Sequence, residues 1–124
     1  MNKAEREKIR NMFDGCCAYC GKDLEKTFHV DHVIPIRRGK EESELYREKR
    51  ADIIGKDEIE NMFPACPRCN RWKATLSLEQ FREEISEQLN RLRLRSAPFR
   101  IAEDYGLVIG MKVPVIFWFE RYHK

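Results

Sequence analysis

The first amphipathic pattern in this chain lies near its N-terminus. In residues 3–13, Ile9, Met12 and Phe13 recur at intervals of three and four among charges of alternating sign. This spacing places the apolar side chains on one face of a helix. Asp14 begins a turn signal, and we expect the helix to end before it.

A second amphipathic helix is predicted over residues 77–93. Its apolar positions follow at spacings of three and four, which give a helix one continuous apolar stripe. These positions are Leu78, Phe81, Ile85, Leu89 and Leu92. Ser77 and Gln80 form the capping-box pattern that marks a helix start.

Two other regions have the alternation typical of strands. Residues 27–36 alternate apolar and polar side chains up to Pro35, so we expect a strand or one arm of a hairpin there. Residues 99–120 contain two apolar runs around Gly110 and predict a C-terminal β-hairpin. Residues 37–60 are mostly charged and are expected to form a surface excursion with one short helix. Together these elements indicate a mixed α+β fold.

Length and composition favour one folded domain over residues 1–124. A chain of this size buries only a modest core, so bound metals become valuable stabilisers. The residues are 36% charged, and the net charge of +3 favours an acidic partner such as nucleic acid only weakly. The N-terminus has no leader pattern and no apolar run could span a bilayer, so we expect a cytoplasmic protein.

The five cysteines include two Cys-x-x-Cys pairs, Cys17 with Cys20 and Cys66 with Cys69. In a cytoplasmic protein such pairs indicate metal ligands more than disulfides, and two pairs complete a tetrahedral structural zinc site. The alternative is a redox motif or inert buried thiols. Cys16 is left over: it could replace Cys17 as a ligand, but the Cys-x-x-Cys spacing selects Cys17, and we expect Cys16 to be buried by packing.

Polar residues with catalytic potential lie beside these cysteines. Asp31-His32 lies in the expected strand, and Asn70 directly follows Cys69. If zinc anchors Cys69, the carboxylate of Asp31 and the amide oxygen of Asn70 can converge on a hard ion such as Mg²⁺; Mn²⁺ or another divalent ion could also bind. If a local bend or twist lets the adjacent Asp31 and His32 both approach the substrate, the imidazole of His32 can take a proton from a water that attacks phosphorus.

The order of these motifs resembles that of the HNH endonucleases. C-x-x-C, VDHVIP and EIENMFPACPRCNRWK follow one another between Cys17 and Lys73. The resemblance implies a small ββα-metal (His-Me finger) core, here over about residues 14–76 with a zinc knuckle and flanking helices. The helix over 77–93 and the strands over 99–120 extend this core within a single domain.

The same resemblance implies a role for each residue of the active centre. His32 would be the general base, with Asp31 and Asn70 as ligands of the catalytic ion. Asn61 would be the middle Asn, which braces the loop and orients His32. Position 70 is Asn where the name-giving motif ends in His, so the chain resembles the His-Asn-Asn variant.

Basic residues near these motifs are candidates for contacts with the DNA backbone, which position a duplex without reading its sequence. The candidates are Arg37, Arg38, Arg68, Arg71 and Lys73, with His29 as a further side chain near phosphate. A solvated charged surface is the alternative for each basic residue, and a packed or surface histidine is the alternative for His29. Trp72 could pack on the core or against a sugar, and we expect the core.

The sequence therefore predicts a nuclease that cuts DNA, and the alternative is a zinc-knuckle module that binds nucleic acid without cutting it. The joint presence of Asp31, His32 and Asn70 favours the enzyme, because a binding module has no physical need for all three. One centre per chain predicts nicking by a monomer. Double-strand cleavage would most simply require a homodimer.

Overall fold

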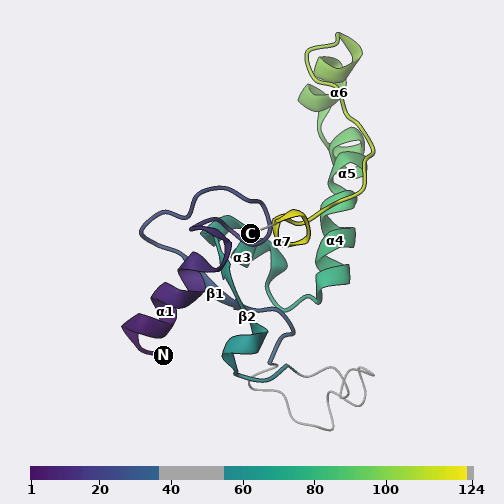
Figure 1. Ribbon diagram of the computed structural model, residues 1–124. Helices are drawn as coiled ribbons and strands as arrows, with labels where there is room; N and C mark the ends of the chain where they lie inside the picture. Colours follow the sequence, from purple (N-terminus) through teal and green to yellow (C-terminus); the bar gives the residue numbers. More distant parts are fainter. Residues whose placement is uncertain (37–54, 123–124) are drawn as a thin grey trace, which may run out of the picture.

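The computed structural model describes residues 1–36 and 55–122. In these residues it consists of helices and one small two-stranded sheet, which confirms the α+β class (Figure 1). They are α1 (Lys3–Arg10), η1 (Asn11–Phe13), β1 (His29–His32), η3 (Ile59–Asn61), β2 (Met62–Ala65), α3 (Pro67–Lys73), α4 (Leu78–Ser86), α5 (Gln88–Arg95), α6 (Ala97–Asp104) and α7 (Trp118–Arg121). None of the helices in these two ranges is long and apolar enough to cross a membrane.

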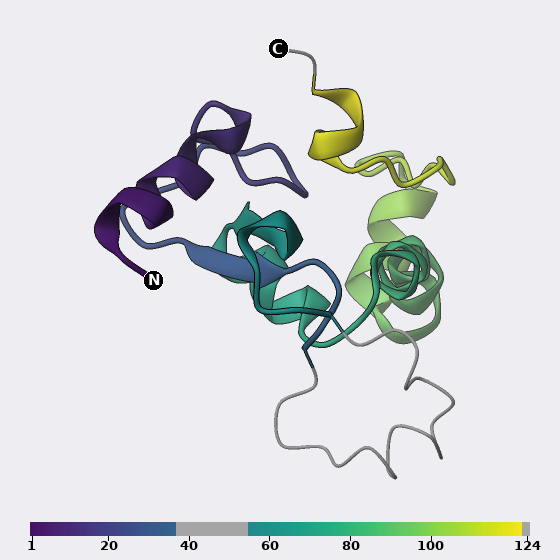
Figure 2. The ribbon, with the colours of Figure 1, turned by 60° about the horizontal axis from the view of Figure 1, so that its bottom comes forward.

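The sheet consists of β1 and β2, which pair antiparallel with Asp31 opposite Phe63 and His32 opposite Met62. The helix α3 follows β2 directly and packs against both strands. In Figures 1 and 2, α1 and the helices α4 to α6 lie on opposite sides of the unit made by the sheet and α3. The order β1, β2, α3 gives the ββα arrangement that the sequence led us to expect.

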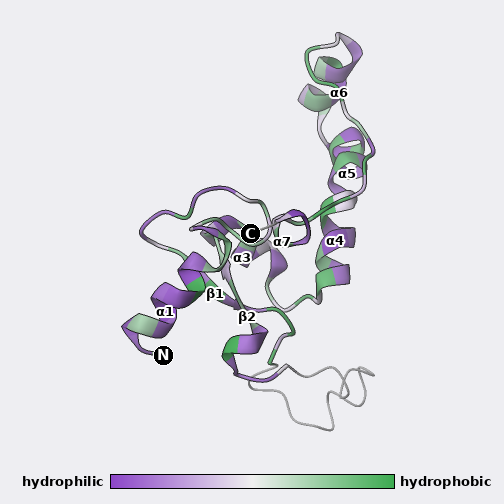
Figure 3. Cartoon of the chain, in the orientation of Figure 1, coloured by the Kyte–Doolittle hydropathy of each residue, from purple (hydrophilic) through white to green (hydrophobic). Residues whose placement is uncertain are grey.

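Local capping explains where the helices begin. The side chain of Asn2 accepts a hydrogen bond from the Glu5 N–H, and α1 starts there. The predicted capping box forms at α4: the Gln80 N–H donates to Ser77 Oγ and the Ser77 N–H donates to Gln80 Oε1. The predicted helix over 77–93 is thus present, divided at Glu87 into α4 and α5. Figure 3 shows polar and apolar residues interleaved along both helices.

The prediction of a C-terminal β-hairpin over residues 99–120 was wrong. Residues 97–104 form α6, which Ser96 caps by accepting a hydrogen bond from the Phe99 N–H. The chain then returns in an extended form without strand pairing and ends in α7 (Figure 1). Phe117 of this segment is buried in the core, and Val115 and Phe119 pack partly against it. Val113 and Ile116 remain 58% and 48% exposed.

This C-terminal segment covers the turn that holds the first two cysteines. The N–H groups of Trp118 and Phe119 donate to the carbonyls of Tyr19 and Ala18, at 2.9 and 2.8 Å. Gly21 has the positive φ that its turn requires, and a Cβ atom there would meet the Trp118 ring at 2.8 Å. Only glycine fits such a position without displacing the ring.

Candidate active site and zinc centre

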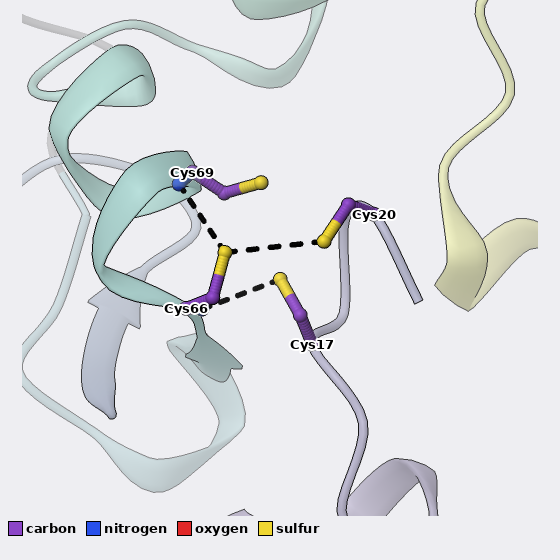
Figure 4. A group of neighbouring side chains, drawn as sticks. All are labelled: Cys17, Cys20, Cys66 and Cys69. Atoms are coloured by element: carbon purple, nitrogen blue, oxygen red, sulfur yellow. Dashed lines mark hydrogen bonds between the residues drawn. The ribbon is translucent and has the colours of Figure 1, made fainter. Parts of the chain in front are cut away.

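The four cysteines of the two Cys-x-x-Cys pairs come together in space. Figure 4 shows Cys17 and Cys20 facing Cys66 and Cys69, and the four sulfurs all lie within 4.8 Å of one another. Sulfurs that share one tetrahedral zinc lie about 3.8 Å apart, given a Zn–S bond near 2.3 Å. The Cys20 and Cys66 sulfurs are 3.9 Å apart, so this pair already has the spacing of two zinc ligands.

Hydrogen bonds in this cluster favour a thiolate at Cys17, whereas the same contact with Cys17 raises the pKa of Cys69. The Cys66 N–H donates to the Cys17 sulfur at 3.3 Å, and the Cys69 N–H donates to the Cys66 sulfur at 3.4 Å. A hydrogen bond from the Cys69 thiol, helped by backbone N–H groups, lowers the pKa of Cys17 to about 4 despite its burial. Such bonds stabilise the deprotonated form that a metal ligand needs. Cys16 lies outside the cluster, as expected, with its sulfur 3.6 Å from Asp23.

The cysteine cluster lies at the start of α3, the helix that contains Asn70. Cys66 is the N-cap of α3 and Pro67 occupies its first turn, where a missing N–H costs nothing. Asn70 follows Cys69 within the helix and is half-buried. Because α3 packs against β1, Asn70 belongs to the element that lies beside the strand of Asp31 and His32.

His32 ends β1 and makes a contact that the sequence did not predict. Its Nε2 atom lies 2.8 Å from Oδ1 of Asp57, a carboxylate that is 59% exposed. The imidazole itself is 22% exposed and borders an open groove of about 780 Å³. His29, Arg6 and Asp57 line the same groove. Asp57 could not be found from sequence because it is 25 residues from His32 and has no motif of its own.

Asn61 ties together the two loops that flank His32. Its Oδ1 accepts the Ile34 N–H at 2.8 Å, and its Nδ2 donates to the carbonyls of Ile34 and Lys56 at 2.8 and 3.0 Å. Its backbone carbonyl also accepts the Val33 N–H at 2.9 Å. These bonds hold the chain that leaves β1 against the chain that enters β2.

Asp31 points away from His32, because neighbouring side chains in a strand face opposite sides. Its carboxylate is 4% exposed and accepts a hydrogen bond from the Tyr19 hydroxyl. Burial, and then the negative charge of Asp31, raises the pKa of Tyr19, so the phenol is the donor. The ammonium of Lys73 lies 3.1 Å from the same Asp31 oxygen.

The basic residues that are candidates for contacts with the DNA backbone differ in their exposure. Arg68 and Arg71 are exposed on α3, and a hydrogen bond with the Cys69 sulfur raises the pKa of Arg68. Lys73 is fully buried, so a direct contact with a DNA phosphate is not available to it. Arg37 and Arg38 lie outside the described residues. Trp72 is 48% exposed, so the expectation that it packs in the core was wrong.

Comparisons with known proteins agree with this geometry. Residues 17–45, which include Cys17, Asp31 and His32, match the family model described as HNH endonuclease. A protein of Bacillus subtilis strain 168, named "SPbeta prophage-derived putative HNH endonuclease YoqL", is 28% identical over 88 residues. The aligned part takes in 71% of this chain and 36% of that relative, so the chain spans about a third of the relative's length. The matches confirm the resemblance read from the sequence and support a nuclease function in general.

Proposed function

The chain carries the HNH endonuclease motif, and from that premise we propose that it hydrolyses phosphodiester bonds of DNA with the help of a divalent ion. The observation that carries this proposal is the pair formed by His32 and Asp57 beside an open groove. A histidine that lines a groove and is held at one ring nitrogen can use the other nitrogen to activate water.

His32 would act as the general base through Nδ1. In the neutral imidazole one nitrogen carries the proton, and the acceptor Asp57 Oδ1 favours that proton on Nε2. Nδ1 is then unprotonated and can accept the proton of a water that attacks phosphorus. Asn61 supports this role by holding the backbone just after His32 through its bonds to Ile34.

Asp31 and Asn70 would hold the catalytic ion. A carboxylate and an amide oxygen are hard donors that suit Mg²⁺ or Mn²⁺, and a magnesium ion needs few protein ligands because it keeps several waters. Zinc at the four cysteines orders α3 and so sets the position of Asn70 relative to β1. When bound, the divalent ion would stabilise the charge on the phosphate and on the leaving oxygen.

The DNA backbone would lie along the groove beside His32. His29 and Arg6 line this groove, and Arg71 is exposed on α3. Arg68 adds a further exposed charge next to the zinc centre. Contacts from such side chains bind phosphates irrespective of sequence. We keep Arg37 and Arg38 in this proposal on the sequence alone and leave out Lys73 as a phosphate contact.

The test is cleavage of supercoiled plasmid by the zinc-loaded protein with Mg²⁺ or Mn²⁺, with EDTA as the metal-free control. Asn70→Ala should abolish cutting, whereas Asn90→Ala, an exposed asparagine on α5, should cut as the wild type does. DNA binding without cutting under any divalent ion would instead favour the zinc-knuckle binding module.

A further inference from the structure

Lys73 is a fully buried lysine that the proposed reaction does not use. It is the last residue of α3, and its side chain is 0% exposed. A lysine withdrawn from water keeps its charge only beside an anion, and here that anion is Asp31. The Lys73 Nζ lies 3.1 Å from Asp31 Oδ2, 3.4 Å from Asp31 Oδ1 and 3.1 Å from the carbonyl of His32.

The two oxygens of Asp31 are engaged unequally. Oδ2 accepts both the Tyr19 hydroxyl and the shorter contact from Lys73. Oδ1 has only the longer Lys73 contact among the bonds above, so it retains more capacity to accept a further ligand. The carboxylate that would bind the divalent ion therefore already has a positive charge beside it.

We propose that Lys73 is a resident counter-cation of Asp31 that competes with the catalytic ion, and so sets the ion concentration at which the site fills. This inference rests on the proposed role of Asp31 as a metal ligand. The Lys73 ammonium and the divalent ion would both be attracted to the carboxylate of Asp31. A divalent ion and an ammonium a few ångströms apart repel each other where little water screens them.

Two roles of Lys73, competition with the ion and orientation of the Asp31 carboxylate, predict opposite effects of its removal on ion binding. If Lys73 competes for Asp31, removal of its charge strengthens divalent-ion binding. If Lys73 only orients the carboxylate, its removal weakens binding because Asp31 loses its position. Lys73→Met removes the charge with similar side-chain length, and Lys73→Arg retains the charge.

The experiment measures Mn²⁺ binding without DNA, by electron paramagnetic resonance of free Mn²⁺, on zinc-loaded full-length protein. We expect Lys73→Met to bind Mn²⁺ about tenfold more tightly than the wild type or more, a modest share of the repulsion between such close charges. Lys73→Arg should bind more weakly than Lys73→Met. The matched control is Lys112→Met, which removes an exposed charge far along the chain and should bind as the wild type does.

The wild type and Asp31→Asn separate failure of this inference from failure of the proposed function. If Asp31→Asn weakens Mn²⁺ binding but Lys73→Met does not strengthen it, the competition is overturned and the ligand role of Asp31 stands. If Asp31→Asn leaves Mn²⁺ binding unchanged, Asp31 is not a ligand, and both the competition by Lys73 and the proposed ligand role of Asp31 are overturned.

Folding supplies a second measurement, because Lys73→Met leaves the buried Asp31 without its counter-ion. If this variant is unfolded in the absence of divalent ions, Mn²⁺ should restore its circular dichroism spectrum by replacing the lost charge. Failure to recover at saturating Mn²⁺ would overturn the inference.

Discussion

The imidazole of His32 and the carboxylate of Asp57 form a hydrogen bond of 2.8 Å between Nε2 and Oδ1. The two residues come from separate segments, His32 from the end of β1 and Asp57 from the chain that leads into η3. The bond selects one tautomer of a neutral histidine and fixes the ring against rotation. Asp57 is thus proposed as a positioning residue that acts on the reaction through His32.

Substitution of Asp57 should therefore slow cleavage without reducing zinc content. We expect Asp57→Ala to lower kcat by about 10- to 100-fold, because a misplaced catalytic group loses orientation, while KM changes little. The side-chain oxygen of Asp57→Asn can still accept a hydrogen bond from the Nε2–H of His32, so this variant should retain more activity than Asp57→Ala. Equal rates for all three proteins would remove Asp57 from the scheme. The ¹⁵N shifts of the His32 ring would report the tautomer independently of activity.

Loss of a zinc ligand should unfold the core. Cys66 is both a member of the cysteine cluster and the N-cap of α3, and serine can still cap the helix, so Cys66→Ser removes a metal ligand and keeps the cap. Structural zinc contributes on the order of 10 kcal/mol to folding in small domains. Elemental analysis should give far less than one zinc per chain, and circular dichroism should show lost helix. Cys16→Ser is the matched control, and a loss of zinc in that variant would contradict the assigned ligand set.

Tyr19 lies in the turn between Cys17 and Cys20 and contacts Asp31 of β1. Its ring packs edge-on against Phe81 and Phe117, with centroids 5.5 and 5.4 Å away, and its hydroxyl reaches Asp31. Tyr19→Phe should destabilise the protein by about 1–3 kcal/mol, because a buried carboxylate loses a donor. Thermal unfolding of the zinc-loaded protein should show a lower midpoint. Tyr105→Phe, at a site 79% exposed, should leave the midpoint unchanged, and an equal shift in both variants would argue against the Asp31 contact.

Removal of the Asn61 side chain should disturb the loops around His32 more than the zinc centre. Asn61→Ala loses the side-chain bonds to Ile34 and Lys56, so we expect plasmid cleavage to fall by about 100-fold, as for other misplaced catalytic groups. Zinc content should remain at one per chain, since none of these bonds reaches a cysteine. Full activity of Asn61→Ala would show that the clamp is dispensable for the reaction.

Local patterns predicted the parts of the fold that depend on local chemistry. Ser77 and Gln80 could be identified because a capping box involves residues three apart, and the Cys-x-x-Cys spacing alone selected Cys17 over Cys16. The order of the motifs resembles that of the HNH endonucleases, and this resemblance predicted the antiparallel sheet and the helix after it.

The parts that the sequence did not predict depend on distant partners. An apolar run near Phe117 is typical of a strand, but whether it pairs or packs depends on which surface is available, and here the zinc turn and α4 supply it. Lys73 suggested a phosphate contact because a charge is usually exposed. Its burial depends on Asp31, 42 residues away. The contact of Asp57 with His32 is likewise long-range.

The most direct test of the central claim is the rate at which His32→Ala nicks supercoiled plasmid in Mg²⁺, compared with wild type at equal zinc content. Loss of the general base predicts a rate lower by about 100-fold or more, with the melting temperature close to that of the wild type because the imidazole lies at the edge of the groove. Wild-type cleavage by His32→Ala would contradict the account.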